Sequence, residues 1–592
     1  MCGIVGQISF KQNIEETIFS AMRDSLAHRG PDGFGSWFSE DRKIAMGHRR
    51  LTLLDLTENG KQPMTNEDGT LWLTFNGEIY NYIELKKELE SAGHKFKSTA
   101  DTEVIIHGFE QWGCGVVNKL KGMFAFGLWN ENTKKLFLAR DRFGIKPLYY
   151  YQSTECFIFS SEIKAIIQNP IVVKEIDFSS MSDYLTYRYV PSPKTIWKNI
   201  KKLPAAHFFE LDFTGNERIS EYWKIQFGSK RINEKKAIEQ VDEILLNSIA
   251  THIRCDVPVG SFLSGGYDSS AMIYYLSRLN YKPQTFSIGF EGWKESEHHY
   301  AEIVANHFGT QHTSTVVGAE SLDILEKLAT VYDEPLADIS IIPTYIVSNA
   351  ASQKVKTVLS GEGADELFCG YSWHSALSNT NPFVSNLLRL KSFFTKPENN
   401  YFVGQYAQAM AMGKFENKNI SELLNADLNA YIPEYSDWFY SKQYKRDVST
   451  IKSFQNMDIK CFMGELVLTK IDRASMANSL EVRVPFLDHD LYEFVLGLDD
   501  SVYFKPGEKK FLLRENIKNH LPQQIINRAK QGFVGPDSYY MNIDWYASQL
   551  RNGKLLKDQI IRKDKLEELI LQKDHWRLWK ILVLELWYAR WN

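Results

Sequence analysis

The sequence has few cysteines, and none of them are paired at a metal-binding or redox spacing. Six cysteines occur among 592 residues, at positions 2, 114, 156, 255, 369 and 461. This count is low for the length and no CxxC motif is present, so a disulfide framework and a structural zinc site are not expected. A reducing compartment is the better interpretation, and we expect the protein to be cytoplasmic.

The sequence also lacks long apolar runs and a strong excess of either charge. No window holds the ~18 consecutive apolar residues of a membrane span, and the N-terminus does not resemble a signal peptide. The formal net charge of -4 gives no electrostatic reason to expect nucleic acid or a membrane as a partner. With 44% hydrophobic and 24% charged residues, the chain is typical of globular proteins, and its length suggests roughly two to four domains.

The first 150 residues contain short strand-like runs separated by Gly, Asn and Asp, a pattern that favours antiparallel sheets. A helix is predicted over 82–92. Asn81 followed by Glu84 indicates an N-cap with a capping box at its start, and Gly93 indicates its end. We therefore expect an α+β domain in which helices cover two sheets, an αββα sandwich of the Ntn-hydrolase type. The strand-like runs are 4–8, 71–75, 123–126 and 135–138.

From about residue 235, strand and helix patterns alternate, which predicts an α/β domain with a parallel sheet. Beyond 380 the pattern is mostly helical, including a Trp-rich C-terminal helix. Residues 170–235, with Pro191, Pro193 and Pro204, read as a connector. The expected domains are 2–210, including connector, and 235–592. The alternating elements are helix 237–253, strand 257–263, helix 269–279, strand 285–290, helix 297–307 and strand 355–359.

Cys2 follows the initiator methionine directly. Removal of Met1 would leave a thiol and an α-amine on one residue. An unperturbed α-amine has a pKa of about 7.7–8.0, so it can act as a base for a cysteine nucleophile. Taken alone, Cys2 is more simply interpreted as an ordinary buried cysteine.

Several motifs around Cys2 resemble those of class II glutamine amidotransferases, in the family's order through the first 165 residues. The motifs are Cys2-Gly3-Ile4-Val5-Gly6, His28-Arg29-Gly30-Pro31-Asp32-Gly33, Gly47-His48-Arg49-Arg50-Leu51, Asn76-Gly77-Glu78-Ile79-Tyr80-Asn81 and Asp101-Thr102-Glu103. The resemblance implies that Cys2 attacks the side-chain amide of glutamine.

The same resemblance assigns glutamine-binding roles. It implies an oxyanion hole from the Asn76 amide and the Gly77 N–H, and a bidentate contact from Arg50 to the glutamine carboxylate. Glu78 and Asp101 would receive the α-ammonium. The simpler alternatives are a hairpin turn at Asn76-Gly77 and solvated surface charges at Arg50 and Asp101.

A second cluster, Ser264-Gly265-Gly266-Tyr267-Asp268-Ser269-Ser270, lies between a predicted strand and a predicted helix. Glycines and a helix N-terminus favour anion binding, although a plain loop is the simpler alternative. No Gly-Lys-Ser/Thr follows, so this is not a Walker A loop. The cluster resembles the pyrophosphate loop of N-type ATP pyrophosphatases, with Tyr267 where leucine is common. The resemblance implies ATP binding by Phe262, Ser264, Gly265, Gly266, Asp268, Ser269 and Ile288.

A third cluster, Ser360-Gly361-Glu362-Gly363-Ala364-Asp365-Glu366-Leu367-Phe368, follows another predicted strand. It is similar to the second signature of that family, with Cys369 where glycine is usual. Ser360 and Gly361 would contact ATP, and Glu362 would help to form an acyl-adenylate. Asp268 and Asp365 are the expected Mg²⁺ ligands, since Mg²⁺ prefers carboxylate and phosphate oxygens, with helix capping as their alternative role. Lys530 would offset charge on the pyrophosphate or adenylate.

Together with Lys470–Met476 and Leu480–Asp488, these motifs resemble glutamine-hydrolysing asparagine synthetases over nearly the whole chain. The resemblance implies ATP-dependent amidation of aspartate through β-aspartyl-AMP, with ATP and Mg²⁺ required. It implies glutamine, aspartate and ATP as small-molecule partners. A homodimer is one possible oligomeric state. Two alternatives remain: the same chemistry on another carboxylate, such as a uronic acid, and a non-catalytic scaffold.

Overall fold

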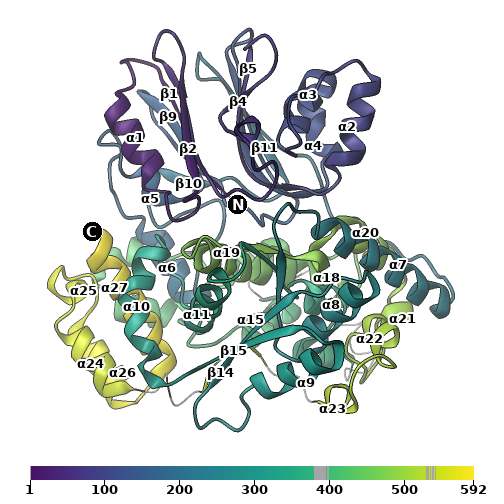
Figure 1. The fold of residues 1–592 in the computed structure, drawn as a ribbon. Helices are drawn as coiled ribbons and strands as arrows, with labels where there is room; N and C mark the ends of the chain where they lie inside the picture. Colours follow the sequence, from purple (N-terminus) through teal and green to yellow (C-terminus); the bar gives the residue numbers. More distant parts are fainter. Residues whose placement is uncertain are drawn as a thin grey trace.

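The chain folds into two domains, and its N-terminus lies where they meet (Figure 1). The computed structural model describes residues 2–378, 395–396, 399–528, 532–533, 535–536, 539 and 542–592. In Figure 1 the purple and blue N-terminal domain is drawn above the teal, green and yellow C-terminal domain.

Two six-stranded sheets form the N-terminal domain. Their strand orders are β10-β8-β9-β1-β3-β2 and β12-β11-β7-β6-β5-β4, and the paired strands are antiparallel. The strands are β1 (Gly3–Ser9), β2 (Gly33–Phe38), β3 (Ile44–Arg50), β4 (Met64–Thr65), β5 (Leu71–Ile79), β6 (Gly122–Asn130), β7 (Lys135–Arg140), β8 (Tyr149–Gln152), β9 (Cys156–Ser160), β10 (Ile200–Lys202), β11 (His207–Asp212) and β12 (Glu217–Glu221).

Helices cover the outer faces of both sheets, with α1 beside the first sheet and α2, α3 and α4 beside the second (Figure 1). Every residue of β1 is buried, as a strand with both faces covered requires. The predicted αββα sandwich is therefore confirmed. The helices are α1 (Glu16–Asp24), α2 (Tyr82–Ser91), α3 (Glu103–Trp112), α4 (Val116–Lys119), α5 (Ile163–Ile166) and α6 (Phe178–Tyr187).

The capping box expected at α2 is wrong, although the helix itself is confirmed. Asn81 makes no side-chain cap bond to α2. Its amide donates to the Lys119 carbonyl at 3.0 Å, and its oxygen accepts from the Lys121 N–H at 2.9 Å. Glu84 pairs with Arg254 of the other domain. Tertiary partners therefore replaced the local bonds that the sequence pattern predicts.

The stretch expected as a connector contains four elements. Helix α6 packs beside the C-terminal helices, where the Tyr184 hydroxyl donates to the Lys580 carbonyl at 2.8 Å. Strand β10 then joins the first sheet, and β11 and β12 join the second. The segment thus ties the N-terminal domain to the last helix of the chain.

A five-stranded sheet in the order β15-β14-β13-β16-β17 organises the C-terminal domain. All its neighbouring strands are parallel, so the predicted α/β fold is confirmed. The order reverses between β13 and β16, and in open α/β sheets ligands bind at the carboxyl ends of strands at such a switch point. The strands are β13 (Val259–Phe262), β14 (Gln284–Phe290), β15 (Gln311–Val317), β16 (Thr357–Leu359) and β17 (Glu481–Arg483).

Helices surround this sheet among the described residues, and the Trp-rich C-terminal helix is confirmed as α27. They are α7 (Glu234–His252), α8 (Tyr267–Arg278), α9 (His298–Phe308), α10 (Leu325–Val331), α11 (Ile341–Ser352), α12 (Ala364–Leu367), α13 (Ser372–Ser378), α15 (Tyr401–Ala409), α16 (Asn417–Leu423), α17 (Trp438–Gln443), α18 (Thr450–Met457), α19 (Leu468–Met476), α20 (His489–Gly497), α21 (Asp500–Tyr503), α22 (Phe511–Ile517), α23 (Gln523–Ile526), α24 (Ile543–Arg551), α25 (Lys554–Lys557), α26 (Lys563–Leu571) and α27 (His575–Trp591).

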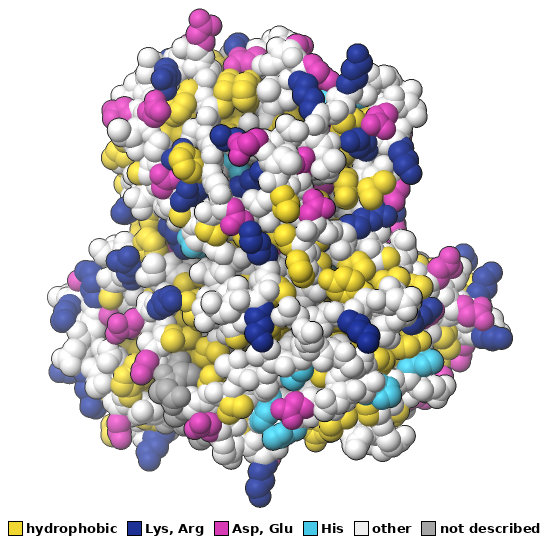
Figure 2. Space-filling model, viewed as in Figure 1, with side chains coloured by type: hydrophobic (Ala, Val, Ile, Leu, Met, Phe, Trp, Pro, Cys, Tyr) yellow, Lys and Arg dark blue, Asp and Glu magenta, His cyan; other side chains and the backbone are white. Residues whose placement is uncertain are grey.

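The outer surface carries charge of both signs. Acidic and basic side chains are interspersed over the face shown in Figure 2, and neither sign dominates it. Among the described residues, no helix has the length and apolar character needed to cross a bilayer.

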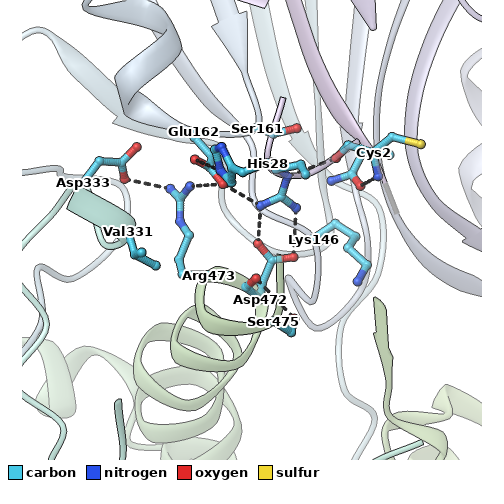
Figure 3. Close-up of polar contacts among 12 residues, drawn as sticks. Cys2, His28, Lys146, Ser161, Glu162, Val331, Asp333, Asp472, Arg473 and Ser475 are labelled. Atoms are coloured by element: carbon cyan, nitrogen blue, oxygen red, sulfur yellow. Dashed lines mark hydrogen bonds and ion pairs between the residues drawn. The ribbon is translucent and has the colours of Figure 1, made fainter. Parts of the chain in front are cut away.

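Buried charges hold the two domains together. Arg29 of the N-terminal domain is 0% exposed, and its guanidinium donates to Asp472 of α19 at 2.8 and 3.0 Å and to Glu162 at 2.8 Å. Arg473 of α19 lies 2.9 Å from Glu162 and 3.0 Å from Asp333. Figure 3 shows Asp472 and Arg473, on α19, directed toward Glu162 and Asp333. Each buried charge has a partner, so the junction depends on the complete set.

Replacing Asp472 by Asn should therefore destabilise the protein markedly. Arg29 would lose a charged partner where no water can replace it, and breaking one partner from a buried ion pair costs about 3–5 kcal/mol. We expect a clear fall in the thermal unfolding midpoint, measured by calorimetry, that added salt does not diminish, because buried pairs are poorly screened.

Glu84→Gln is the matched control, since Glu84 also bridges the domains but its side chain is 57% exposed. Exposed ion pairs contribute about 0–1 kcal/mol, so its midpoint should stay close to that of the parent protein. Equal losses in the two variants would contradict the importance of the buried network.

Candidate active site

Cys2 lies immediately before β1 and is held at both ends of its backbone. Its nitrogen donates to Asn76 Oδ1 at 3.0 Å, and its carbonyl accepts from Arg29 Nε at 3.0 Å. Figure 3 shows the Cys2 sulfur directed away from the buried ion network. Burial raises the pKa of the thiol, so near neutrality the thiol form predominates and a nearby base is required to form the thiolate.

Asn76 and Gly77 lie inside β5, which excludes the hairpin turn that these two residues suggest when read alone. Asn76 is fully buried, and its Nδ2 has no hydrogen-bond partner among the described residues. A side chain at Gly77 would meet the Met123 carbonyl oxygen at 2.1 Å. Buried donors are normally satisfied, so the open Asn76 amide beside Cys2 fits an oxyanion that forms during reaction.

Two buried carboxyl groups lie at the end of β5: Glu78 belongs to the strand, and Asp101 reaches it from the segment before α3. Glu78 Oε1 lies 3.0 Å from Arg483 Nη2, and Asp101 accepts the Ile79 N–H at 2.7 Å. Burial raises the pKa of Glu78 well above its usual range despite Arg483, and burial raises the pKa of Asp101 to about 7. A bound cation would favour ionisation of both groups, which fits the predicted α-ammonium contact.

Arg50 ends β3 and its guanidinium turns toward the loop over 54–57. It donates to the carbonyls of Thr57 at 3.0 Å and Leu54 at 3.3 Å, and also to that of Asp55. Arg50 is half-buried, and three carbonyls position its guanidinium. The structure thus brings Cys2 and Asn76 into contact, and leaves the predicted pairing of Arg50 with a carboxylate untested.

The first phosphate-type loop connects β13 to α8. Ser264 Oγ accepts the Gly266 N–H at 3.2 Å and lies 3.1 Å from Ser269 Oγ. Gly265 has φ +71°, and a side chain there would meet the Tyr300 carbonyl carbon at 2.5 Å. Only glycine fits this tight turn, and the turn places the N-terminus of the 12-residue helix α8 at the carboxyl edge of the sheet.

Tyr267, where leucine is common in the resembling family, has a partner of its own. Its hydroxyl donates to the Ile526 carbonyl at 2.9 Å, and the Arg514 guanidinium lies 5.5 Å from the centre of its ring. The substitution therefore adds a contact between the loop and the end of α23.

The second loop follows β16 and touches the first. A side chain at Gly361 would lie 3.0 Å from Asp268 Cβ. Asp365 is in the first turn of α12, and Glu362 Oε2 is buried with no hydrogen-bond partner among the described residues. The two loops thus meet at the switch point between β13 and β16, where the sheet topology predicts a ligand.

Lys510, which the sequence patterns did not single out, joins the two loops. Its Nζ lies 2.6 Å from both Asp268 carboxylate oxygens and 2.7 Å from Asp365 Oδ1. Burial lowers the pKa of Lys510, but the two carboxylates more than offset this and hold it above its usual range. A lysine in a polar turn after Gly507 carries no signal that distinguishes it from an exposed lysine.

The remaining predicted residues lie around these loops. Phe262 pairs with Phe286 of β14, and Ile288 is two positions further along that strand, buried. Ser360 donates its N–H to the Arg483 carbonyl at 2.9 Å. Lys530 lies outside the described residues.

This arrangement fits a magnesium nucleotide. Asp268 and Asp365, from two different loops, converge on one cation, Lys510, so two carboxylates are close enough to share a second cation. Hard oxygen ligands from one or two carboxylates, completed by phosphate oxygens, are the usual Mg²⁺ environment. The Gly265 turn and the N-terminus of α8 suit the phosphates.

Comparison with known proteins agrees with this division of the chain. The glutamine amidotransferase domain family matches residues 1–223, and the asparagine synthase family matches residues 240–589. The chain belongs to the asparagine synthase family. It is therefore an ATP-dependent, glutamine-hydrolysing ligase of the asparagine synthetase type.

Curated relatives extend over both domains. Asparagine synthetase [glutamine-hydrolyzing] 1 of Bacillus subtilis (strain 168) is 34% identical, covering 100% of this chain and 96% of its own length. A putative asparagine synthetase [glutamine-hydrolyzing] of Mycobacterium bovis is 32% identical, covering 95% and 92%. Amidase chry2 of Gibberella zeae is 29% identical, covering 90% and 86%.

Lys510→Met should impair the ATP half of the enzyme selectively. The cation that neutralises Asp268 and Asp365 would be lost from the phosphate site, and removal of one group that stabilises developing charge typically costs about 10²–10³ in kcat. We expect a loss of this size in pyrophosphate release, and little change in glutamate release measured without ATP.

Lys509→Met provides the matched control, since Lys509 is the next residue and is half-buried. It should leave both rates near those of the parent. The proposed position of Lys510 in the ATP site would be wrong if both variants behaved alike, or if Lys510→Met slowed the two reactions equally.

Proposed function

We propose that this protein converts aspartate to asparagine, with ammonia from glutamine and with ATP cleaved to AMP and pyrophosphate through β-aspartyl-AMP. The observation that carries the proposal is the Cys2–Asn76 contact, which places an unpaired buried amide donor beside a cysteine nucleophile. The family match supports joining this site to an ATP site in the same chain. We further propose that the protein is cytoplasmic.

In the glutaminase half, the Cys2 thiol passes its proton to the α-amine exposed by removal of Met1. The sulfur attacks the glutamine Cδ, and the resulting oxyanion is stabilised by Asn76 Nδ2 and the Gly77 N–H. Collapse of this intermediate forms a thioester and releases ammonia, which leaves with the transferred proton. Water then hydrolyses the thioester to glutamate and regenerates Cys2. Arg50 binds the glutamine carboxylate, and Glu78 and Asp101 bind its ammonium.

In the synthetase half, the loop over 264–269 and residues Ser360 and Gly361 bind the ATP phosphates, while Phe262 and Ile288 pack against the adenosine. Asp268 and Asp365 would hold Mg²⁺, which supplies charge neutralisation at the phosphates. A carboxylate oxygen of aspartate attacks the α-phosphorus and expels pyrophosphate, whose charge Lys510 offsets. Glu362 assists formation of the adenylate, and ammonia then displaces AMP from the acyl carbon.

The acceptor is the part of this scheme with an alternative. A relative of the same build bears the name amidase chry2, so family membership alone does not define the amidated compound. The residues that handle glutamine and ATP would serve equally for another carboxylate, such as a uronic acid. A non-catalytic scaffold would not require the unpaired Asn76 donor beside Cys2.

The deciding experiment measures pyrophosphate release by purified protein with ATP, Mg²⁺ and glutamine, with and without aspartate, and identifies products by mass. We expect pyrophosphate to depend on aspartate and to match asparagine in amount. Cys2→Ala should lose the reaction with glutamine and keep it with ammonium chloride. Glutamate release without aspartate-dependent pyrophosphate would exclude aspartate, and uronic acids would be tested next.

Glutamine binding should weaken as the pH falls. Burial raises the pKa of Asp101 to about 7, and the α-ammonium of glutamine favours ionised Asp101, so binding below pH 7 must expel a proton. Glu78, whose pKa burial also raises, contributes in the same direction. In the Cys2→Ala variant, the glutamine Kd should therefore rise below pH 7 with a slope of about tenfold or more per pH unit. Calorimetry in buffers of different ionisation enthalpy would measure both the affinity and the proton release.

Asp101→Asn in the same background is the control, because it leaves the titration of the N-terminal amine in place. It should bind glutamine more weakly and lose the Asp101 contribution to the pH dependence. A Kd that is constant from pH 8 to pH 6 before this substitution would rule out Asp101 as the ammonium partner.

A further inference from the structure

Arg483 touches both candidate sites at once. It ends β17, the strand at one edge of the parallel sheet, and pairs in register with Leu359 of β16. Its carbonyl accepts the N–H of Ser360 at 2.9 Å. Ser360 opens the loop that carries Glu362, so the Arg483 backbone positions the first residue of the adenylation loop.

The Arg483 side chain leaves the sheet and enters the junction with the N-terminal domain. Nη2 lies 3.0 Å from Glu78 Oε1, Nε lies 2.6 Å from Glu481 Oε1, and Nη1 donates to the carbonyls of His252 and Arg254 at 2.7 and 2.8 Å. Glu78 follows Asn76 and Gly77 on β5. One residue therefore joins the adenylation loop to the proposed ammonium site for glutamine.

Packing makes this connection stiff. Arg483 is 0% exposed, and partners on both sides of its guanidinium hold the side chain in one arrangement. Buried, close-packed groups transmit displacements rather than absorbing them. A shift of Ser360 when ATP binds would therefore move the Arg483 backbone, and with it the guanidinium that positions Glu78.

The charges around Arg483 indicate that glutamine binding would in turn affect the ATP site. Glu78 and Glu481 both lie at the guanidinium of Arg483. The ammonium of glutamine would favour the ionised form of Glu78, which burial otherwise disfavours, and an ionised Glu78 binds the Arg483 guanidinium more strongly. Occupancy of the glutamine site thus alters the bonds of the same residue that supports Ser360.

We propose that Arg483 is a positioning residue that couples the two sites, so that ATP bound at the loop over 360–362 tightens glutamine binding at Glu78, and glutamine tightens ATP binding equally. The inference rests on the proposed function, because it takes these residues as the ATP and glutamine sites. Coupling between binding sites is reciprocal and typically amounts to about 5–150-fold in affinity.

The test measures the glutamine Kd by calorimetry in the Cys2→Ala protein, with and without ATP and Mg²⁺ and without any acceptor or ammonia. We expect ATP to tighten glutamine about fivefold or more, and glutamine to tighten ATP by the same factor. Arg483→Lys in this background keeps the charge, but a lysine cannot bind two carboxylates and two carbonyls together. The ratio of the glutamine Kd without ATP to that with ATP, which we call the coupling factor, should therefore fall to about one.

Arg254→Lys is the matched control. Arg254 spans the same interface but bonds to Glu84 at 2.9 Å and to the Tyr80 carbonyl at 2.7 Å, so its variant should keep the factor. Glu78→Gln tests the other end of the bridge if Arg483→Lys does not fold. It should weaken glutamine binding and also reduce the factor to about one.

Several outcomes would overturn the inference. These are a factor of about one in the Cys2→Ala protein itself, an unchanged factor in Arg483→Lys or Glu78→Gln, and an equal loss in Arg254→Lys. Absence of glutamine or ATP binding altogether would instead remove the proposed function. Binding of both ligands without Arg483-dependent coupling would leave the function standing and reject only the role of Arg483.

Discussion

The structure depends on a buried pairing of charges between its two domains, centred on Arg29 and Asp472. Arg29 binds Asp472 and Glu162 and also donates to the carbonyl of Cys2. The same guanidinium therefore secures the domain junction and the backbone of the nucleophile. Because a buried charge without a partner is very costly, the position of Cys2 follows from the docking of a helix in the other domain.

The ATP half shows the same reliance on shared charges. Two short loops from β13 and β16 are brought together by the parallel topology, and Lys510 holds their carboxylates. The sheet supplies the coarse geometry, since strand ends on one edge must be near each other. The lysine supplies the local charge balance, which a metal nucleotide would then extend. The sheet topology and the Lys510 ion pairs are separate contributions, and the proposed ATP site requires both.

The sequence patterns predicted the fold class of both domains and most of the individual elements. Strong periodicity and glycine-rich turns have local causes, so helix α2 and the loop at Gly265 were predictable. The capping box at Asn81 was wrong because Lys119, Lys121 and Arg254, all distant in sequence, offer competing partners. Local patterns cannot anticipate bonds that exist only after the domains have docked.

The same limit explains the residues that sequence reasoning did not select. Lys510 and Arg483 both act through contacts with segments far away in the chain: Lys510 stands in no motif, and the Leu480–Asp488 motif that contains Arg483 gives that residue no role. Cys2, Asn76 and Glu78 were selected because they stand in motifs that together resemble those of class II glutamine amidotransferases. Their roles in this chain stay predictions, while the hydrogen bond between Cys2 and Asn76 is a feature of the structure.

The charge network also bears on how such proteins diverge and how they can be recombined. A chimaera that joins this amidotransferase half to the ATP half of a relative would need counterparts of Asp333, Asp472 and Arg473 in positions that match Arg29 and Glu162. The halves are consequently not interchangeable modules, and two hydrophobic clusters also contain residues of both halves. Because the buried ion pairs join residues of both halves, a change of charge in one half requires a compensating change in the other. Encoding both halves in one chain keeps these paired residues together.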